Sequence, residues 1–297
     1  MSAKRRYLHP FLDSDRWQKF EPRSGDIVIA TPFKSGTTWM QMIVLGLLHG
    51  IKNPPLLREV GHWLDFRPEP EEETLARLEE QSSRRFIKTH LPFDAIKFDK
   101  NIRYIVVDRD PRDVFMSLWN HYKNMDVDLV NSGLPPDVHP IPPCPDSIHE
   151  FWKSWLTKGY FEWESEGYPF WSNLRHVQSW FDVKDLDNVL HVHYNNLLLD
   201  SESEIMRVAK FIEVDISDEE VKSLANYTSF ESTKKNLNKL FPGGYRLFKN
   251  GPDTFFHKGK NGRWKSVLTQ EDEMLLSEAA STMLSKACFK WLTFGTL

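Results

Sequence analysis

One stretch near the beginning of the chain reads Asp26-Ile-Val-Ile-Ala-Thr-Pro-Phe-Lys-Ser-Gly-Thr-Thr-Trp39. Its first five residues form a short apolar run typical of a buried strand, Thr31-Pro32 ends that run, and residues 40–48 continue as an apolar helix. A strand, a tight loop and a helix are therefore expected in succession. At such a junction the loop amides and the first helical N–H groups point outward together, and the helix dipole favours an anion there.

The side chains of this loop also favour an anion. Lys34 adds a formal charge, Gly36 lets the backbone approach a ligand closely, and the neighbouring hydroxyls add donors, from Ser35, Thr37 and Thr38. The usual nucleotide-triphosphate loop needs its Lys after the second Gly, whereas Lys34 precedes Gly36. We therefore expect a phosphate or sulfate site that is not a standard Walker A loop, with an ordinary Ser/Thr-capped helix start as the alternative.

Length and composition indicate a globular protein. The chain has 297 residues, 40% of them hydrophobic, and a net charge of −4 with dispersed basic residues. Such a charge distribution lacks the basic footprint of a nucleic-acid-binding protein, so no nucleic-acid partner is expected.

Cysteine use and hydropathy point to a compartment. Two cysteines, Cys144 and Cys288, are too few for a disulfide scaffold or a Cys-based zinc site, and no Asp/His cluster has ligand spacing, so no metal is expected. The N-terminus lacks the apolar segment of a signal peptide, and no apolar stretch is long enough to span a bilayer. We expect a soluble, cytoplasmic protein with no membrane partner.

Four apolar runs predict strands, each followed by a helical pattern. They begin near residues 26, 85, 102 and 188, and helices are expected over about 200–212, 217–225 and 269–287. This alternation predicts an α/β fold with a central parallel sheet flanked by helices.

Polar side chains follow two of these strands. Lys88 and His90 stand two apart, so they point to the same side, at the sheet edge where the first loop would lie. They are a candidate charge stabiliser and base, or else surface decoration. Arg109 and Ser117 are placed to reach one anion if the intervening helix packs back on the strand; the alternative is that Arg109 pairs with Asp113.

Three later segments have an unusual amino-acid composition. Residues 126–147 are rich in Pro and Asp, and residues 151–180 are rich in aromatic side chains. Residues 255–265 form a basic, Gly-containing loop that suggests an anion contact, with a solvated loop as the alternative. Residues 126–176 and 231–254 are expected to shape a small-molecule pocket, because such pockets are built from aromatic walls with a few polar groups.

Taken in order, these motifs resemble the cytosolic sulfotransferases, which use 3′-phosphoadenosine 5′-phosphosulfate (PAPS). Lys34-Ser-Gly-Thr-Thr-Trp39 resembles the family's 5′-phosphosulfate loop, and Lys88-Thr-His-Leu-Pro92 resembles its Lys-Thr-His-Leu-Pro segment. The resemblance covers nearly the whole chain. It implies a P-loop-like nucleotide-binding sulfotransferase fold, a single domain over 1–297, and transfer of a sulfuryl group from PAPS to a hydroxyl or amine of a small-molecule acceptor.

The resemblance also implies roles for individual residues. His90 would be the general base, Lys34 and Lys88 would stabilise charge, and Ser117 would hold Lys34 aside until the acceptor arrives. The implied donor contacts are Lys34, Ser35, Gly36, Thr37, Thr38, Trp39 (on the adenine), Arg109 and Ser117 (on the 3′-phosphate), Tyr194, Thr228 and Phe230 (near the adenine), and Phe255, Phe256, His257, Lys258 and Gly259 of the basic loop.

The chain departs from the family pattern in two places. His257 stands where the family has Arg, and Arg263 where it has Asp; His is only part-charged near neutrality and offers phosphate fewer donors. The family's dimer motif is incomplete, because Gln270 and Met274 replace its Val and Glu, so the sequence leaves monomer and homodimer open.

Two other functions are compatible with parts of the pattern. An ATP-dependent kinase would need a regular Walker A loop and an acidic Mg²⁺ ligand, for which Asp108 is a weak candidate. A non-enzymatic nucleotide or small-ligand carrier would keep the fold without the chemistry. The acceptor is not specified by the sequence, although Asp126, Asp128 and Asp137 suggest a cationic one.

Overall fold

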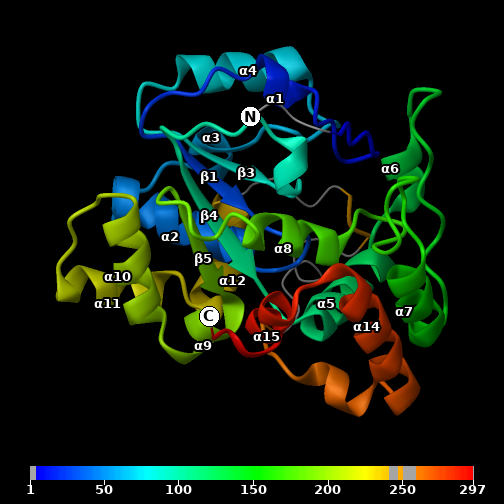
Figure 1. The fold of residues 1–297 in the computed structure, drawn as a ribbon. Helices are drawn as coiled ribbons and strands as arrows, with labels where there is room; N and C mark the ends of the chain where they lie inside the picture. The colour runs from blue at the N-terminus through cyan, green and yellow to red at the C-terminus, as the bar shows by residue number, and fades with distance from the viewer. Residues whose placement is uncertain (1–4, 241–246, 250–258, 297) are drawn as a thin grey trace.

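A five-stranded sheet, parallel throughout, forms the centre of the molecule. The computed structural model describes residues 5–240, 247–249 and 259–296, and within them the strand order is β2-β3-β1-β4-β5 (Figure 1). The strands are β1 (Ile27–Ala30), β2 (Gly61–Trp63), β3 (Phe86–Thr89), β4 (Arg103–Asp108) and β5 (Val189–His193). The predicted α/β fold with a parallel sheet is thereby confirmed.

The sequence did not predict β2. This strand has three residues at the sheet edge, too few to show an alternating pattern, and it exists through its pairing with β3. In that register Gly61 lies opposite Phe86, and Trp63 lies opposite Lys88. An edge strand therefore brings Trp63 to the strand end that carries Lys88.

Because β1 is the central strand, the loop that follows it lies between the ends of two other strands. β1 pairs with β3 on one side and β4 on the other, with Ala30 opposite both Thr89 and Val106. In open parallel sheets, ligands bind beyond the carboxyl ends of the strands where the order of connections reverses. The loop after β1 lies at this point.

Successive side chains of β1 enter different layers of the core, as strand geometry requires. Ile27 and Ile29 pack with residues of α2 (Thr37–His49), α10 (Ser201–Phe211) and α11 (Asp218–Tyr227). Val28 and Ala30 belong to a second cluster, with residues of α5 (Pro111–Lys123), α7 (Ile148–Thr157) and α8 (Asn173–Phe181). Because β1 is buried on both faces, its sequence is a continuous apolar run.

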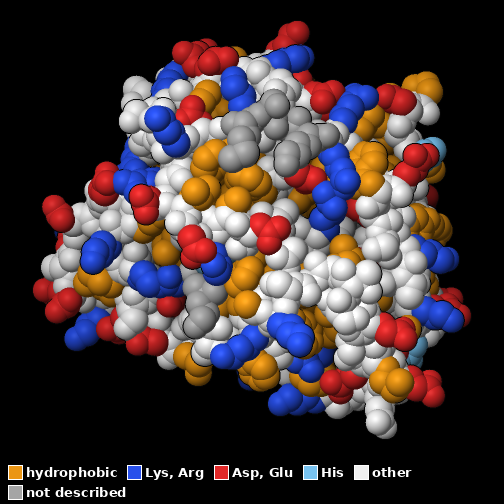
Figure 2. All heavy atoms as spheres, viewed as in Figure 1, with side chains coloured by type: hydrophobic (Ala, Val, Ile, Leu, Met, Phe, Trp, Pro, Cys, Tyr) orange, Lys and Arg blue, Asp and Glu red, His pale blue; other side chains and the backbone are white. Residues whose placement is uncertain are grey.

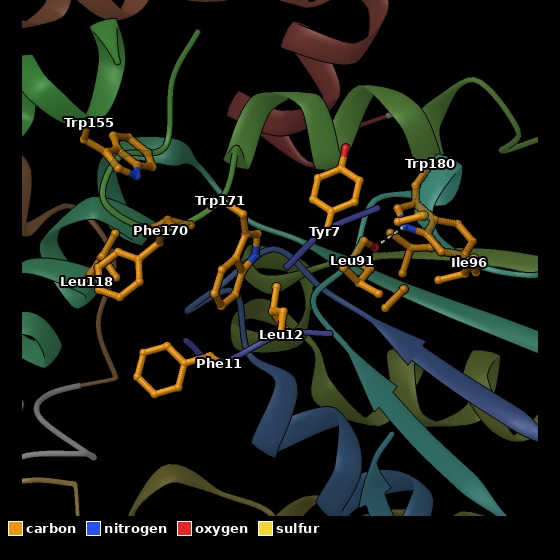
Figure 3. Close-up of a cluster of buried hydrophobic side chains, with 14 of the residues drawn as sticks. Tyr7, Phe11, Leu12, Leu91, Ile96, Leu118, Trp155, Phe170, Trp171 and Trp180 are labelled. Atoms are coloured by element: carbon orange, nitrogen blue, oxygen red, sulfur yellow. Dashed lines mark hydrogen bonds between the residues drawn. The ribbon is translucent and has the colours of Figure 1, made fainter. Parts of the chain in front are cut away.

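The aromatic segment supplies much of the second cluster. Trp155, Phe170, Trp171 and Trp180 are all buried, and Figure 3 shows Tyr7 and Leu91 beneath α8, with Trp171 and Trp180 near its two ends. The indole N–H of Trp180 donates to the carbonyl oxygen of Leu91 over 3.2 Å. This bond ties α8 to the chain immediately after His90.

The helices cover both faces of the sheet and its ends (Figure 1). The α-helices are α1 (Arg16–Lys19), α2 (Thr37–His49), α3 (Leu57–Val60), α4 (Glu71–Glu80), α5 (Pro111–Lys123), α6 (Val127–Asn131), α7 (Ile148–Thr157), α8 (Asn173–Phe181), α9 (Tyr194–Leu199), α10 (Ser201–Phe211), α11 (Asp218–Tyr227), α12 (Phe230–Leu240), α14 (Gln270–Met283) and α15 (Lys286–Phe294). The 3₁₀ helices of the described residues are η1 (Phe93–Ala95) and η2 (Arg263–Ser266).

One helix prediction was wrong at its end. Residues 269–287 were expected to form one helix, but α14 ends at Met283 because Leu284 has an extended backbone. The hydroxyl of Ser285 then caps a new helix, α15, by accepting from Cys288 N. The helices predicted over 200–212 and 217–225 are confirmed as α10, capped by Asp200, and α11, capped by Ser217.

Charges of both signs are interspersed over the face seen in Figure 2, with apolar side chains between them. Within the described ranges, no helix is both long and apolar enough to cross a membrane.

Candidate active site

The ends of the strands surround a cavity of about 420 Å³. Lys34 follows β1, Lys88 and His90 stand at the end of β3, Arg109 follows β4, and Tyr194 follows β5; all five line this cavity. The parallel sheet thus gathers polar side chains that lie far apart in the sequence.

The loop after β1 has an unusual backbone. Lys34 has φ 69° and Gly36 has φ 111°, both in the left-handed region that costs a non-glycine residue roughly 1–2 kcal/mol. Gly36 is followed at once by α2, so the free N–H groups of the first helical turn open onto the cavity, where Thr37 and Thr38 also lie. This backbone has the shape that the predicted anion site requires, and the anion contact itself stays a prediction.

Glycine is required at position 36 for a second reason. A Cβ atom there would lie 2.8 Å from Cδ2 of the Tyr194 ring. That ring in turn lies edge-on to Trp39, with centroids 5.4 Å apart, and beneath the Arg109 guanidinium at 4.0 Å. Loop, ring and guanidinium are packed as one unit.

Two buried polar atoms of this unit have no hydrogen-bond partner among the described residues. They are the hydroxyl oxygen of Ser35 and the indole nitrogen of Trp39. Buried polar groups are normally satisfied, so unpaired ones beside a cavity mark a place where a polar ligand fits.

Arg109 is held by a residue that the sequence analysis missed. Its Nε and one terminal nitrogen donate to Oδ1 of Asn261 over 3.1 and 2.8 Å, and the other donates to the carbonyl oxygen of Lys34 over 3.3 Å. The suggested pairing of Arg109 with Asp113 is replaced by another bond, in which Asp113 accepts from Gly262 N over 2.7 Å. In the sequence, Asn261 stands between Gly259 and Gly262 of the basic loop. This position is the feature of the sequence that could have indicated its role.

His90 is oriented by a hydrogen bond at one nitrogen. Its Nδ1 lies 2.9 Å from the carbonyl oxygen of Thr31, which can only accept, so Nδ1 carries the proton and Nε2 is the basic nitrogen. The side chain is buried, with Phe33, Trp63 and Trp171 around its ring. Burial and the nearby Lys88 charge hold the pKa of His90 well below its usual value, so the ring is neutral at pH 7.

Lys34 approaches a second histidine. Its Nζ lies 3.1 Å from Nδ1 of His121, one helical turn beyond Ser117 on α5. Burial, with the charges of Arg109 and Lys88, lowers the pKa of Lys34 to about 7. Burial also lowers the pKa of Lys88, to about 8. Both amines are thus near the boundary between charged and neutral forms at physiological pH.

Most predicted site residues meet at this one cavity. It is lined by Lys34, Gly36, Thr37, Thr38, Trp39, Lys88, His90, Arg109, Ser117, Tyr194, Thr228, Phe230 and Gly259. Ser35 is fully buried in the loop and does not line it. Phe255, Phe256, His257 and Lys258 lie outside the described residues.

One part of the cavity lining is mainly apolar and was only partly predicted. It comprises Phe11, Phe33, Trp63, Phe66, Met125, Leu247 and Phe248, together with His121. Residues 231–254 contribute, as expected, through Thr233, Leu247 and Phe248. No residue of 126–176 lines the cavity; this segment contributes only indirectly, through Phe170 and Trp171, which pack against Phe33.

A family model described as "Sulfotransferase domain" matches residues 24–286. The chain belongs to the sulfotransferase family. This assignment confirms the predicted enzyme class, and it sets aside both the kinase and the carrier interpretations.

This sulfotransferase is similar to several curated relatives. It is 30% identical to the glycolipid sulfotransferase of Mycobacterium bovis (strain BCG / Pasteur 1173P2), covering 90% of this chain and 88% of the relative. It is 28% identical to sulfotransferase 1A1 of Rattus norvegicus, covering 90% and 87%.

Solved structures share the fold of this sulfotransferase. Mouse sulfotransferase SULT7A1, complexed with PAP, superimposes with a TM-score of 0.70 at 20% identity, over 93% of this chain and 91% of that one. Retinol dehydratase, in complex with androsterone and the inactive cofactor PAP, gives 0.67 at 21% identity, over 88% and 82%.

Across the described part of this sulfotransferase, no three or more His, Cys, Asp or Glu side chains are grouped as a metal site would require.

Proposed function

We propose that this sulfotransferase, acting as a single domain, transfers the sulfuryl group of PAPS to the hydroxyl group of an uncharged, apolar small molecule. The observation that carries the proposal is the single cavity in which the anion loop, the His90 ring and an apolar wall meet. The PAP complexes of the two solved neighbours support the donor. Here Trp39, whose indole nitrogen has no hydrogen-bond partner among the described residues, lines the cavity and is an additional donor for such a ligand.

PAPS would supply an activated S–O bond, and residues of this chain would do the rest. The loop from Lys34 to Thr38 would hold the 5′-phosphosulfate, and Arg109, positioned by Asn261, would hold the 3′-phosphate. Trp39 and Tyr194 would pack on the adenine. The loop residues Phe255 to Gly259 are proposed to complete this side.

His90 would act as the general base. Its Nε2 is neutral and faces the cavity from the end of β3, so it can take the acceptor's proton as the acceptor oxygen attacks sulfur. The bond from sulfur to the donor phosphate breaks in the same step, and PAP leaves. Lys34 and Lys88 would stabilise negative charge on the transferred and leaving oxygens.

The lining of the cavity favours a neutral acceptor. Its described lining residues include no Asp or Glu, and they include Lys34, Lys88 and Arg109. Asp126, which suggested a cationic acceptor, caps α6 instead, and Asp128 and Asp137 are exposed. An ammonium group would meet cations on entry, whereas an aromatic or aliphatic body would contact Phe33, Phe66 and Phe248.

The test is sulfate transfer from radiolabelled PAPS to 4-propylphenol and to tyramine, which differ mainly in an ammonium group. We expect kcat/KM to be at least about tenfold higher for the neutral phenol, which corresponds to roughly 1.4 kcal/mol. Equal or better use of tyramine would contradict the acceptor class. Failure to transfer sulfate to any hydroxyl acceptor would contradict the proposed activity.

We further propose a cytoplasmic location. The two cysteines are both free thiols, in keeping with a reducing compartment. Fractionation of the native cells would check this location.

A further inference from the structure

We propose that Trp63 and Asp65 are positioning residues that hold the ammonium group of Lys88 at the acceptor side of the cavity. The inference rests on the role proposed above for Lys88. In the β2–β3 register Trp63 is the direct partner of Lys88, and the Lys88 Nζ lies 4.3 Å from the centroid of the indole ring. A cation at this distance from an indole is attracted by the ring's electron density.

Asp65 fixes that indole. The N–H of Trp63 donates to Oδ1 of Asp65 over 2.5 Å, while Oδ2 accepts from the Thr89 hydroxyl over 2.5 Å and from the Trp17 indole over 2.8 Å. The Asp65 side chain is fully buried. With three donors on one carboxylate, rotation of the Trp63 ring would break a charge-assisted bond in a dry environment.

The Asp65 carboxylate also contacts the segment that carries Lys88 and His90. Thr89 stands between Lys88 and His90, and its hydroxyl also accepts from Leu91 N over 3.0 Å. The Trp63 ring meets the His90 ring nearly at right angles, 5.0 Å between centroids. Trp63 therefore contacts both Lys88 and His90, and Asp65 anchors Trp63 and Thr89 together.

The charged groups around Lys88 favour the same arrangement. Lys88 is faced by Asp65 and Glu69 from the segment after β2, by Lys34 from the loop after β1, and by His90 on its own strand end. Burial lowers the pKa of Lys88, and the two carboxylates oppose that effect. Without the charge of Asp65, Lys88 would lose its proton at a lower pH.

The experiment measures the protonation of Lys88 directly. Wild type, Asp65→Asn and Trp63→Phe are labelled with limiting acetic anhydride between pH 6 and 10, and acetylation of Lys88 is quantified by peptide mass spectrometry. We expect the midpoint for Lys88 to fall by about one pH unit in Asp65→Asn. The midpoint for Lys34 should move the other way, because a neutral Lys88 no longer repels it.

Turnover provides the second readout. In Asp65→Asn, the pH at which kcat is lost on the alkaline side should move with the labelling midpoint of Lys88. Lys88→Arg in that background should remove the shift because guanidinium stays charged.

Trp17→Phe is the matched control for Trp63→Phe: each removes one indole N–H from Asp65, but Trp17 does not line the cavity. We expect Trp63→Phe to lower kcat about tenfold, and Trp17→Phe to leave it within about twofold.

Different results would contradict the positioning role of Trp63 and Asp65 and the proposed function. An unchanged Lys88 labelling midpoint in Asp65→Asn, or equal effects of Trp17→Phe and Trp63→Phe, would overturn this inference. Full turnover by Lys88→Ala would instead overturn the role of Lys88 in the proposed function, whatever the labelling shows.

Discussion

The carbonyl oxygen of Thr31 accepts a hydrogen bond from Nδ1 of His90 over 2.9 Å, and this contact links the two halves of the active site. Thr31 is the first residue of the loop that follows β1, and its hydroxyl also lies 2.6 Å from that of Thr37 at the start of α2. Displacement of the donor loop would therefore be transmitted to the base.

Replacing His90 by Asn tests its role as base. The amide of Asn can still donate to Thr31 but cannot take a proton, so we expect kcat to fall by about 10²- to 10⁴-fold. Calorimetric titration with PAP should give unchanged affinity, since the donor loop is intact. A variant that keeps most of its turnover while binding PAP normally would show that another group is the base.

Donor binding should depend on pH through Lys34. The pKa of its amine is lowered to about 7 by burial and by Arg109 and Lys88, so at pH 8 the free enzyme carries it mostly neutral. An anionic donor favours the ammonium form, so binding should take up a proton. The affinity for PAP should then fall as pH rises above 7, by up to about tenfold per unit.

Calorimetry in Tris and HEPES, which differ in ionisation enthalpy, measures that proton at pH 8. We expect Lys34→Met to lose most of the uptake and Lys34→Arg to bind PAP with little dependence on pH, because guanidinium stays charged. Proton uptake that persists in Lys34→Met would assign the titration to another group, with Lys88 the first candidate because its pKa is about 8.

The residues proposed to bind the donor could be grouped from the sequence because their signals are local. Strand, loop and helix follow one another within residues 26–48, and a parallel sheet necessarily brings the ends of β1, β3 and β4 together. Lys34, His90 and Arg109 could therefore be assigned to one site from strand ends alone.

The remaining residues depend on contacts between distant segments. Trp63 belongs to a three-residue strand that exists only through pairing with β3, and Phe11 reaches the cavity from the N-terminal segment. Asn261 acts on Arg109 across 152 positions of sequence. Neither short edge strands nor single long-range hydrogen bonds leave a periodic pattern, so no local rule identifies them.

Asn261 provides a test of the proposed 3′-phosphate contact. Asn261→Ala removes the acceptor that aligns Arg109, and we expect PAP to bind about three- to tenfold more weakly. Asn261→Asp should weaken PAP more, because a carboxylate would neutralise Arg109 and repel the phosphate. Titration with AMP, which lacks the 3′-phosphate, should show much smaller changes. Equal losses for PAP and AMP would place the Arg109–Asn261 pair elsewhere on the donor.

Gly36 combines a strained backbone with a close contact, and a second glycine separates the two effects. Gly36→Ala places a Cβ 2.8 Å from the Tyr194 ring at φ 111°, whereas Gly50→Ala at φ 71° meets nothing within 4 Å. Both should lose stability from strain, measured by urea unfolding: roughly 1–2 kcal/mol for Gly36→Ala, which stays in the left-handed region, and roughly 1–3 kcal/mol for Gly50→Ala, because the ψ of 176° at Gly50 belongs to a region that is essentially restricted to glycine. Only Gly36→Ala should also displace Tyr194 and the Arg109 stacked on it, lowering PAP affinity about tenfold or more. If the two variants bound PAP equally well, the packing of loop, ring and guanidinium would not be what shapes the donor site.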